Sequence, residues 1–168
     1  MISKEQWLSL SKTAINKPKG KYILTYFLGS MTKKIQSQIT KIAKDNQLEI
    51  IHLADLKCKE SYETGPSEFI DYIESASVFF TDSFHGVAFS ILMNTPFVVY
   101  ERISKSETMY SRIETLLNMF NLESREVNKI NSCNQIFNMD FSGVNSVLER
   151  EREKAIVFLK ESLGSIKQ

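Results

Sequence analysis

The sequence of 168 residues predicts an α/β protein with a Rossmann-like, doubly wound and mainly parallel sheet. Short apolar runs rich in β-favouring residues alternate with amphipathic segments along most of the chain. The spacing between successive runs leaves room for a helix that crosses over between parallel strands, which places helices on both faces of the sheet. A chain of this length fits one domain that buries its core without metal or disulfide staples.

The first half of the sheet follows a polar N-terminal segment. Residues 1–20 end in Lys17-Pro18-Lys19-Gly20 and have the composition of a linker. Residues 22–28 are nearly all apolar or β-favouring, so we expect a central strand buried on both faces. Isoleucines at helical spacing predict an amphipathic helix over residues 32–46, and residues 48–53 form the second strand.

The second half repeats the same alternation. Pro66 suits the first position of a helix that we expect to end near Ser75. The third strand covers residues 77–81 and the next helix residues 84–93. Pro96 then forces a break before a fourth strand over residues 97–100. The expected remaining elements are a helix that includes residues 113–120 and ends at Asn121, and a long C-terminal helix over residues 144–163.

The motif TDSFHG, residues 81–86, is the first candidate site, because ligands of doubly wound sheets bind at the carboxyl ends of the strands. Ser83 can cap the helix that follows, and Gly86 leaves room for a ligand at its first turn. Free amides and the helix dipole favour an anion there. His85 would face that anion and could donate a hydrogen bond or a proton near neutral pH.

Two further clusters are expected at the same edge of the sheet: Gly29-Ser30 after the first strand and Glu101-Arg102 after the fourth. Arg102 and Arg112 offer planar guanidinium groups that match a phosphate or a carboxylate. Each residue also has a plainer interpretation. His85 can be a structural histidine, Asp82 can cap or pair with a loop amide, and Arg112 can be an ordinary exposed helix residue.

Composition and charge exclude several classes of function. The net charge is +1, with about +6 in residues 1–60 and −5 in the rest, but the lysines are scattered without interleaved aromatic residues, so nucleic-acid binding is not expected. The sequence has neither a membrane-spanning run nor an N-terminal signal, which predicts a cytoplasmic protein. Cys58 and Cys133 stand alone, so we expect reduced thiols and no metal site.

The order of these motifs resembles the polysaccharide pyruvyl transferase family. The resemblance runs from about Lys21 through Arg125. Its strongest stretch is TDSFHGVAFSILMNTPFVVYER, preceded by GPSEFIDYIESAS and followed by SRIETLLNMFNLESR. The family often has Asn where this chain has Tyr110. Proteins of that family are built like GT-B glycosyltransferases, from two Rossmann-like halves that face each other across a cleft.

The resemblance implies that residues 21–168 are the C-terminal domain of such a GT-B fold. Residues 1–20 are then the inter-domain segment, and the N-terminal half is absent. Members move a pyruvyl group from phosphoenolpyruvate to a sugar of a cell-surface polysaccharide or its lipid-linked precursor, forming a ketal without a cofactor. The resemblance implies that the pyruvyl transfer takes place in the cytoplasm, with the inner face of the membrane as its expected location. This half alone is expected to be inactive.

The resemblance also implies roles for individual residues. His85 would be the general acid or the proton donor to the phosphate. Ser83, Phe84 and Gly86 would hold the phosphate in their turn, and Arg102 and Arg112 would bind the phosphate or the carboxylate. The acceptor sugar and the ketal linkage are not specified by this half.

Two alternative functions stay open from the sequence. One is half of a GT-B glycosyltransferase that binds a nucleotide sugar, for which Glu101 is the only evident ribose ligand. The other is a non-catalytic α/β interaction module in which His85 is structural.

Overall fold

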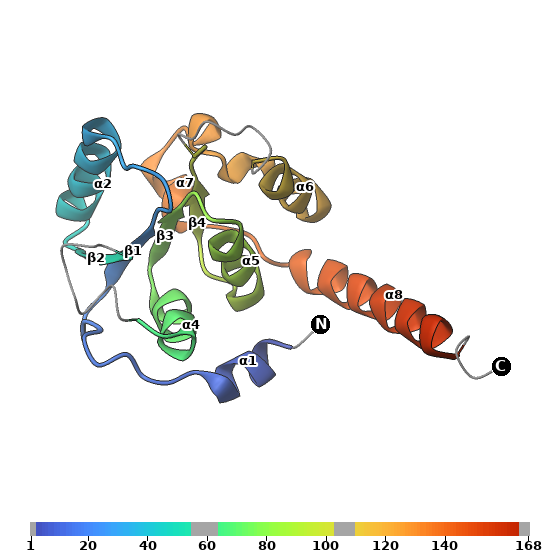
Figure 1. Cartoon of the computed structure of the whole chain (residues 1–168). Coiled ribbons are helices and arrows are strands. Elements are labelled where there is room, and N and C mark those ends of the chain that lie inside the picture. Colours follow the sequence, from blue (N-terminus) through green and yellow to red (C-terminus); the bar gives the residue numbers. More distant parts are fainter. Residues whose placement is uncertain (1–2, 55–63, 103–109, 165–168) are drawn as a thin grey trace.

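A computed structural model of the chain describes residues 3–54, 64–102 and 110–164, and shows a four-stranded parallel sheet (Figure 1). The strands are β1 (Tyr22–Tyr26), β2 (Glu49–Leu53), β3 (Val78–Thr81) and β4 (Phe97–Val99). Their order in the sheet is β2-β1-β3-β4, so β1 is hydrogen-bonded on both sides. The predicted central position of the first strand is confirmed, and the strand order reverses direction between β1 and β3.

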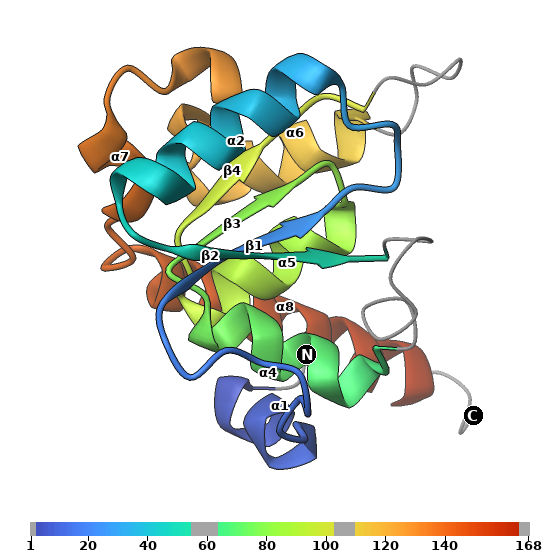
Figure 2. The same cartoon turned by 90° about the vertical axis from the view of Figure 1, so that its left-hand side faces the viewer.

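Helices cover both faces of the sheet, as a doubly wound fold requires (Figure 2). The connecting helices are α2 (Lys33–Asp45), α4 (Pro66–Ser75), α5 (Phe84–Met93) and α6 (Tyr110–Phe120). Two short 3-10 turns, Glu123–Arg125 and Val127–Lys129, lead to α7 (Cys133–Phe137), and α8 (Val144–Gly164) follows. The predicted helices are all present, and α4 has the predicted bounds.

Alternating residues of the strands point into two separate cores. On one face Leu24, Phe79 and Phe97 pack with α4, α5, α6 and the start of α8. On the other face Ile23 and Phe80 pack with α2 and α7. Both faces of β3 are therefore covered by helices. This burial explains why its sequence is an unbroken apolar run that ends in Thr81.

Residues 4–20 differ from the free linker that their composition suggests. They begin with helix α1 (Lys4–Leu10), whose N-cap Ser3 and third residue Gln6 form a capping box. The chain then follows α4, where the amide of Ala14 donates to Asp71 Oδ2 at 2.9 Å and Lys17 Nζ lies 2.7 Å from Asp71 Oδ1. The segment is thus packed against the domain.

Arg125, which the sequence analysis gave no role, holds the end of the sheet to the segment after α6. Its side chain is 2% exposed and donates from Nε to the Phe97 carbonyl at 2.7 Å. The two terminal nitrogens donate to the carbonyls of Gln135 and Ile136 at 2.6 and 3.0 Å. Burial lowers the pKa of Arg125 to about 10, because the charged form loses hydration. One guanidinium group therefore donates hydrogen bonds to three backbone carbonyls.

Replacing Arg125 by Met should destabilise the fold, since the carbonyls of Phe97, Gln135 and Ile136 lose their donors while remaining shielded from water. We expect a loss of about 3 kcal/mol in the free energy of unfolding, measured by urea denaturation. Arg150→Met is the matched control, because Arg150 is exposed and pairs with its neighbour Glu151. Equal stability of the two variants would contradict this role.

Candidate functional site

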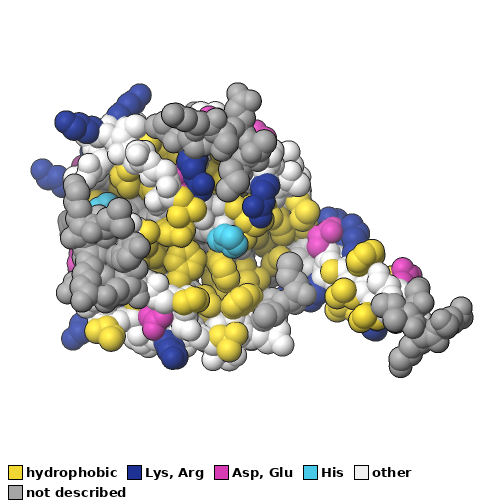
Figure 3. All heavy atoms as spheres, in the orientation of Figure 1, with side chains coloured by type: hydrophobic (Ala, Val, Ile, Leu, Met, Phe, Trp, Pro, Cys, Tyr) yellow, Lys and Arg dark blue, Asp and Glu magenta, His cyan; other side chains and the backbone are white. Residues whose placement is uncertain are grey.

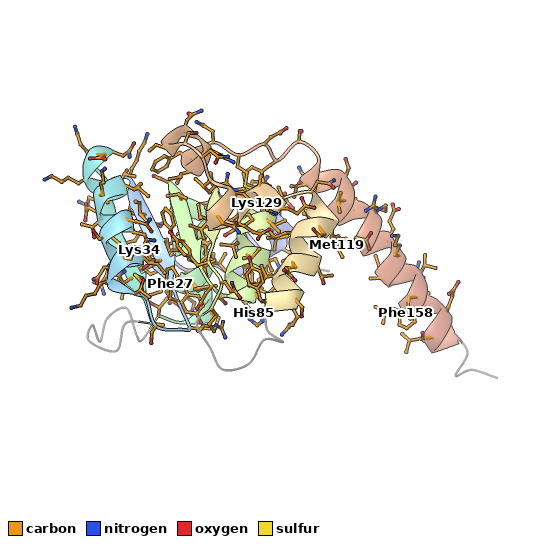
Figure 4. The ribbon with its side chains drawn as sticks, turned by 90° about the horizontal axis from the view of Figure 1, so that it is seen from above. Phe27, Lys34, His85, Met119, Lys129 and Phe158 are labelled. Atoms are coloured by element: carbon orange, nitrogen blue, oxygen red, sulfur yellow. The ribbon has the colours of Figure 1, made fainter. Side chains whose placement is uncertain are left out.

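The carboxyl ends of β1 and β3 form the candidate site, at the point where the strand order reverses. Ligands of open α/β sheets bind at this place because the connections from the two strands leave in opposite directions and open a crevice. Figure 4 shows Phe27, just after β1, and His85, just after β3, at the same edge of the molecule. The sequence expectation that several polar clusters meet here can therefore be tested contact by contact.

Asp82 joins three of these segments. Its carboxylate, which is 3% exposed, accepts from the amides of Leu28 and Gly29 at 2.7 and 2.8 Å. Arg102 donates from Nε to Asp82 Oδ2 at 3.3 Å and from Nη2 to the Asp82 carbonyl at 3.2 Å. The sequence predicts that β1 reaches residue 28, but the strand ends at Tyr26. Just beyond this end, the amides of residues 28 and 29 donate to the Asp82 side chain.

Position 29 at this junction is a glycine for a steric reason. A Cβ built on it would lie 2.8 Å from Cγ of Arg102 and 3.0 Å from Oδ2 of Asp82. The close approach of Arg102 to the backbone therefore depends on the missing side chain.

The first turn of α5 is held by hydroxyl groups. Ser83 Oγ accepts from the Gly86 amide at 3.4 Å, which confirms the predicted N-cap. Thr81 Oγ1 accepts from the Ser83 amide and donates to the Tyr26 carbonyl at 2.7 Å. Ser83 is only 1% exposed, so its side chain serves the helix rather than the surface.

Gly86 faces inward, so the expectation that it leaves room for a ligand is wrong. A Cβ on Gly86 would lie 2.7 Å from Thr81 Oγ1 and 3.1 Å from the ring of Phe79. The glycine lets α5 approach β3 closely. The signal in the sequence was ambiguous, because a glycine in a first helical turn suits both close packing and ligand approach.

Two backbone amides remain free at this helix start. The N–H groups of Phe84 and His85 have no hydrogen-bond partner among the described residues, whereas those of Ser83, Gly86 and Val87 do. They belong to the N-terminus of a ten-residue helix, where the dipole favours negative charge. The imidazole of His85 is exposed beside them.

Phe84 connects His85 to Arg112, which lies in the first turn of α6. The Arg112 guanidinium carbon lies 4.3 Å from the centroid of the Phe84 ring, in cation–π geometry. The rings of Phe84 and His85 are 5.7 Å apart and meet edge to face. Arg112 makes no ion pair within the described part of the chain, so its charge is available to a ligand. Arg112 and His85 thus flank one aromatic ring.

Arg102 differs from Arg112 in this respect. It was expected to contact the substrate as a second cation. The structure instead engages its Nε and Nη2 with Asp82, and its side chain is 18% exposed. The sequence analysis assigned the positive charge of Arg102 to ligand binding. In the structure, the Asp82 carboxylate balances that charge. Sequence spacing could not separate the two arginines, because both follow β4 at positions that suit an anion.

The surroundings of the site are apolar with basic side chains at intervals. Figure 3 views this edge and shows hydrophobic side chains gathered around a histidine, with Lys or Arg side chains nearby.

At the start of α6, Tyr110 donates its hydroxyl to Glu126 Oε2 at 3.3 Å. Burial, and then the Glu126 carboxylate, raise the pKa of Tyr110 above its ordinary value, so it stays protonated.

The other candidate residues lie elsewhere. His52, the second histidine, is on β2, where its Nδ1 lies 2.6 Å from Thr25 Oγ1 of the neighbouring strand β1. Cys133 is an exposed free thiol, and Cys58 lies outside the described residues. The described segments contain no group of three or more potential metal ligands, and no helix in them is both long and apolar enough to cross a bilayer.

Replacing Asp82 by Asn should loosen the junction, because an amide group presents a donor to one of the two N–H groups that the carboxylate now accepts. We expect a loss of about 2 to 3 kcal/mol in unfolding free energy, together with faster hydrogen exchange at Leu28 and Gly29. The exposed Asp45 provides the control variant, Asp45→Asn. Unchanged exchange at both amides would refute the assigned role of Asp82.

Comparison with known proteins supports one family. Neither the curated proteins nor the solved structures include a significant match to this chain. The family model described as polysaccharide pyruvyl transferase matches residues 3–104, more than half of the chain, and this range includes α1, the whole sheet, Asp82, His85 and Arg102. Arg112 lies beyond the matched range. On this match, the chain belongs to the polysaccharide pyruvyl transferase family.

Proposed function

We propose that this edge of the sheet is the phosphoenolpyruvate-binding part of a pyruvyl transferase that forms a ketal on a saccharide. The observation that carries the proposal is the group of three features around Phe84. At the start of α5 the structure places together an exposed imidazole, two amides and one guanidinium group, and neither the amides nor the guanidinium has a hydrogen-bond or ion-pair partner among the described residues. Phosphoenolpyruvate carries a phosphate and a carboxylate on one small molecule, which matches a site with two separate sources of positive potential.

The amides of Phe84 and His85 suit the phosphate, since a helix N-terminus stabilises that group through hydrogen bonds and the dipole together. Arg112 suits either anionic group, with its fork held in place by the ring of Phe84. Phe84 thus acts in this proposal as a support, because its ring fixes the guanidinium and borders the imidazole. Asp82 and Arg102 keep the neighbouring loop in position and contribute little net charge.

The chemistry then requires one group that moves protons. Two hydroxyl groups of the acceptor sugar add to the C2 carbon of the donor, the bond from C2 to the phosphate oxygen breaks, and the methylene carbon becomes a methyl group. The two hydroxyl groups release two protons. One is balanced by the proton that forms the new C–H bond, and the other leaves with the phosphate. His85, exposed beside the phosphate position, is the group that we assign to proton transfer, either to the methylene carbon or to the departing phosphate.

The acceptor is assigned to the other side of the crevice. The described residues around His85 offer hydrophobic side chains and cations but few groups that could select among sugar hydroxyls. A saccharide would therefore be held mainly by a second half of a GT-B arrangement that faces this edge. In this proposal the chain alone binds the donor weakly and does not turn it over.

The proposal is tested by titrating the ¹⁵N-labelled chain with phosphoenolpyruvate, uridine diphosphate and inorganic phosphate, each followed by amide shifts. Phosphoenolpyruvate should shift the amides of Phe84 and His85 and the side-chain signal of Arg112, and should bind more tightly than phosphate. A response to uridine diphosphate alone would favour a nucleotide-sugar enzyme. No response at α5 to any of the three would leave an interaction module as the better interpretation.

Replacing Arg112 by Ala should weaken binding of phosphoenolpyruvate by roughly ten- to a hundredfold, the loss of one charge-assisted hydrogen bond worth about 1.5 to 3 kcal/mol. Arg150→Ala removes the same charge from an exposed position on α8 and should leave affinity unchanged. Calorimetric titration of both variants measures the difference; equal affinities would remove Arg112 from the site.

Replacing His85 by Ala should act mainly on turnover in the assembled two-half enzyme. We expect a loss on the order of 10² to 10⁴-fold, as for other general acids, with a smaller change in donor affinity. Pyruvyl transfer is measured after circular dichroism has shown that the variant is folded. Near-normal turnover would return His85 to a structural role.

A further inference from the structure

The outward side of α2 concentrates positive charge. Four residues of this helix are exposed lysines, and its only acid is the last residue, Asp45, so four positive charges and one negative charge give the helix a net charge of +3. Figure 3 shows Lys or Arg side chains gathered on the side where α2 lies in Figure 1. Figure 4 shows Lys34 on α2, on the side of the molecule away from α6 and α8. The lysines are Lys33, Lys34, Lys41 and Lys44.

Helix geometry places all four lysines on one face. Successive residues of an α-helix are about 100° apart around its axis, so these lysines fall within a sector about 100° wide. The sector lies opposite the stripe around Ile39 and Ala43, which packs in the core on that face of the sheet. From Lys33 to Lys44 the face is about 16 Å long. We call Lys33, Lys34, Ser37, Lys41 and Lys44 the lysine face.

The charges of the lysine face are not balanced within the described part of the chain. None of its four ammonium groups forms an ion pair or a hydrogen bond there. A hollow of about 440 Å³ lies over this side of the helix, and an anion in it would meet ammonium groups from both ends of α2 with hydroxyl groups between them. The hollow is lined by Lys33, Gln36, Ser37, Thr40, Lys41 and Lys44.

We propose that the lysine face binds the headgroups of a bilayer that contains anionic phospholipids. Charge complementarity supports this partner, because each lysine that lies near an anionic bilayer contributes favourable binding energy and the contributions of a cluster accumulate. Phosphate groups of the lipids would enter the hollow, where the ammonium groups converge. The proposal concerns a different side of the domain from the start of α5 and does not depend on the function proposed above.

The composition of the lysine face favours a bilayer over a protein partner. Cores of protein interfaces are enriched in aromatic anchors and depleted in lysine. The lysine face consists of four lysines and one serine, and the other residues that line the hollow are polar as well. The apolar side of α2 is already packed against the sheet, so this helix has no apolar stripe left to insert among acyl chains. Binding is therefore electrostatic and should be lost at high salt.

Co-sedimentation with vesicles tests the proposal. The chain should bind vesicles that contain phosphatidylglycerol and should not bind vesicles of phosphatidylcholine alone. Replacing the four lysines by Gln should weaken binding at low ionic strength on the order of 10² to 10³-fold, since each lysine contributes about fivefold. Glutamine and lysine have similar helix propensities, so the variant should be folded, which circular dichroism verifies. The variant carries Lys33→Gln, Lys34→Gln, Lys41→Gln and Lys44→Gln.

A second fourfold variant removes the same charge from exposed positions outside α2. It should bind anionic vesicles much more tightly than the lysine-face variant, because its lysine face is intact. Equal losses in the two variants would show that net charge alone drives binding, and would overturn the proposal. The matched control carries Lys12→Gln, Arg150→Gln, Lys154→Gln and Lys160→Gln.

Fluorescence quenching identifies the side that faces the bilayer. With both native cysteines replaced by Ser, a fluorophore on Ser37→Cys should be quenched by nitroxide-labelled lipid headgroups. A fluorophore on Ser146→Cys, at an exposed position of α8, should not be quenched. Equal quenching at the two positions, or no binding to anionic vesicles, would overturn the proposal. Tighter binding to polyglutamate or to double-stranded RNA than to vesicles would also overturn it, in favour of an acidic protein or a nucleic acid.

Discussion

The carboxylate of Asp82 is the interaction on which the edge of this domain depends. It accepts the amides of Leu28 and Gly29 after β1 and pairs with Arg102 after β4, while its own backbone follows β3. Three connections that leave neighbouring strands are thereby held by one buried acid. Because the carboxylate satisfies two amides and one cation, its burial leaves little uncompensated charge. The first turn of α5 is positioned as a consequence of that arrangement.

Arg102 and Arg125, which both lie beside β4, show different ways to stabilise a cation. Arg102 has an acidic partner and lies at the ligand-facing edge. Arg125 has no acidic partner among the described residues and donates to three carbonyls instead, and burial lowers its pKa. Both are occupied by the protein itself. Arg112 is left with a ring beneath it and no ion pair in the described segments, which is why the proposed anion site is centred on α6 and α5 rather than on β4.

Packing against β3 explains why the site has its particular composition. Gly86 and Thr81 bring α5 close to the strand, and Ser83 closes its first turn, so none of the three needs to touch a ligand. The residues that remain at the surface are Phe84 and His85. A motif of six residues therefore divides into a buried part that fixes the helix and a more exposed part, Phe84 and His85. In the same way, α8 has buried residues in its first half and exposed residues at 153–164.

The sequence by itself determined the class of fold, the position of β1 and nearly every helix, because these follow from local periodicity, caps and proline. It also located the turn at residues 81–86 and identified the family. It missed α1 and α7, which are too short and polar to show a period, and it gave Arg125 no role.

Only the tertiary structure decided that Arg102 pairs with Asp82 while Arg112 makes no ion pair among the described residues, that Gly86 faces β3, and that an apolar groove lies beside the first half of α8. The pairing of Arg102 and the groove depend on contacts between residues 20 or more positions apart, such as Arg102 with Asp82 and Trp7 with Phe89. Gly86 faces β3 because α5 packs against Thr81 and Phe79 of that strand. Such contacts form only when the sheet brings distant strands to one edge, so no pattern within a single segment can specify them.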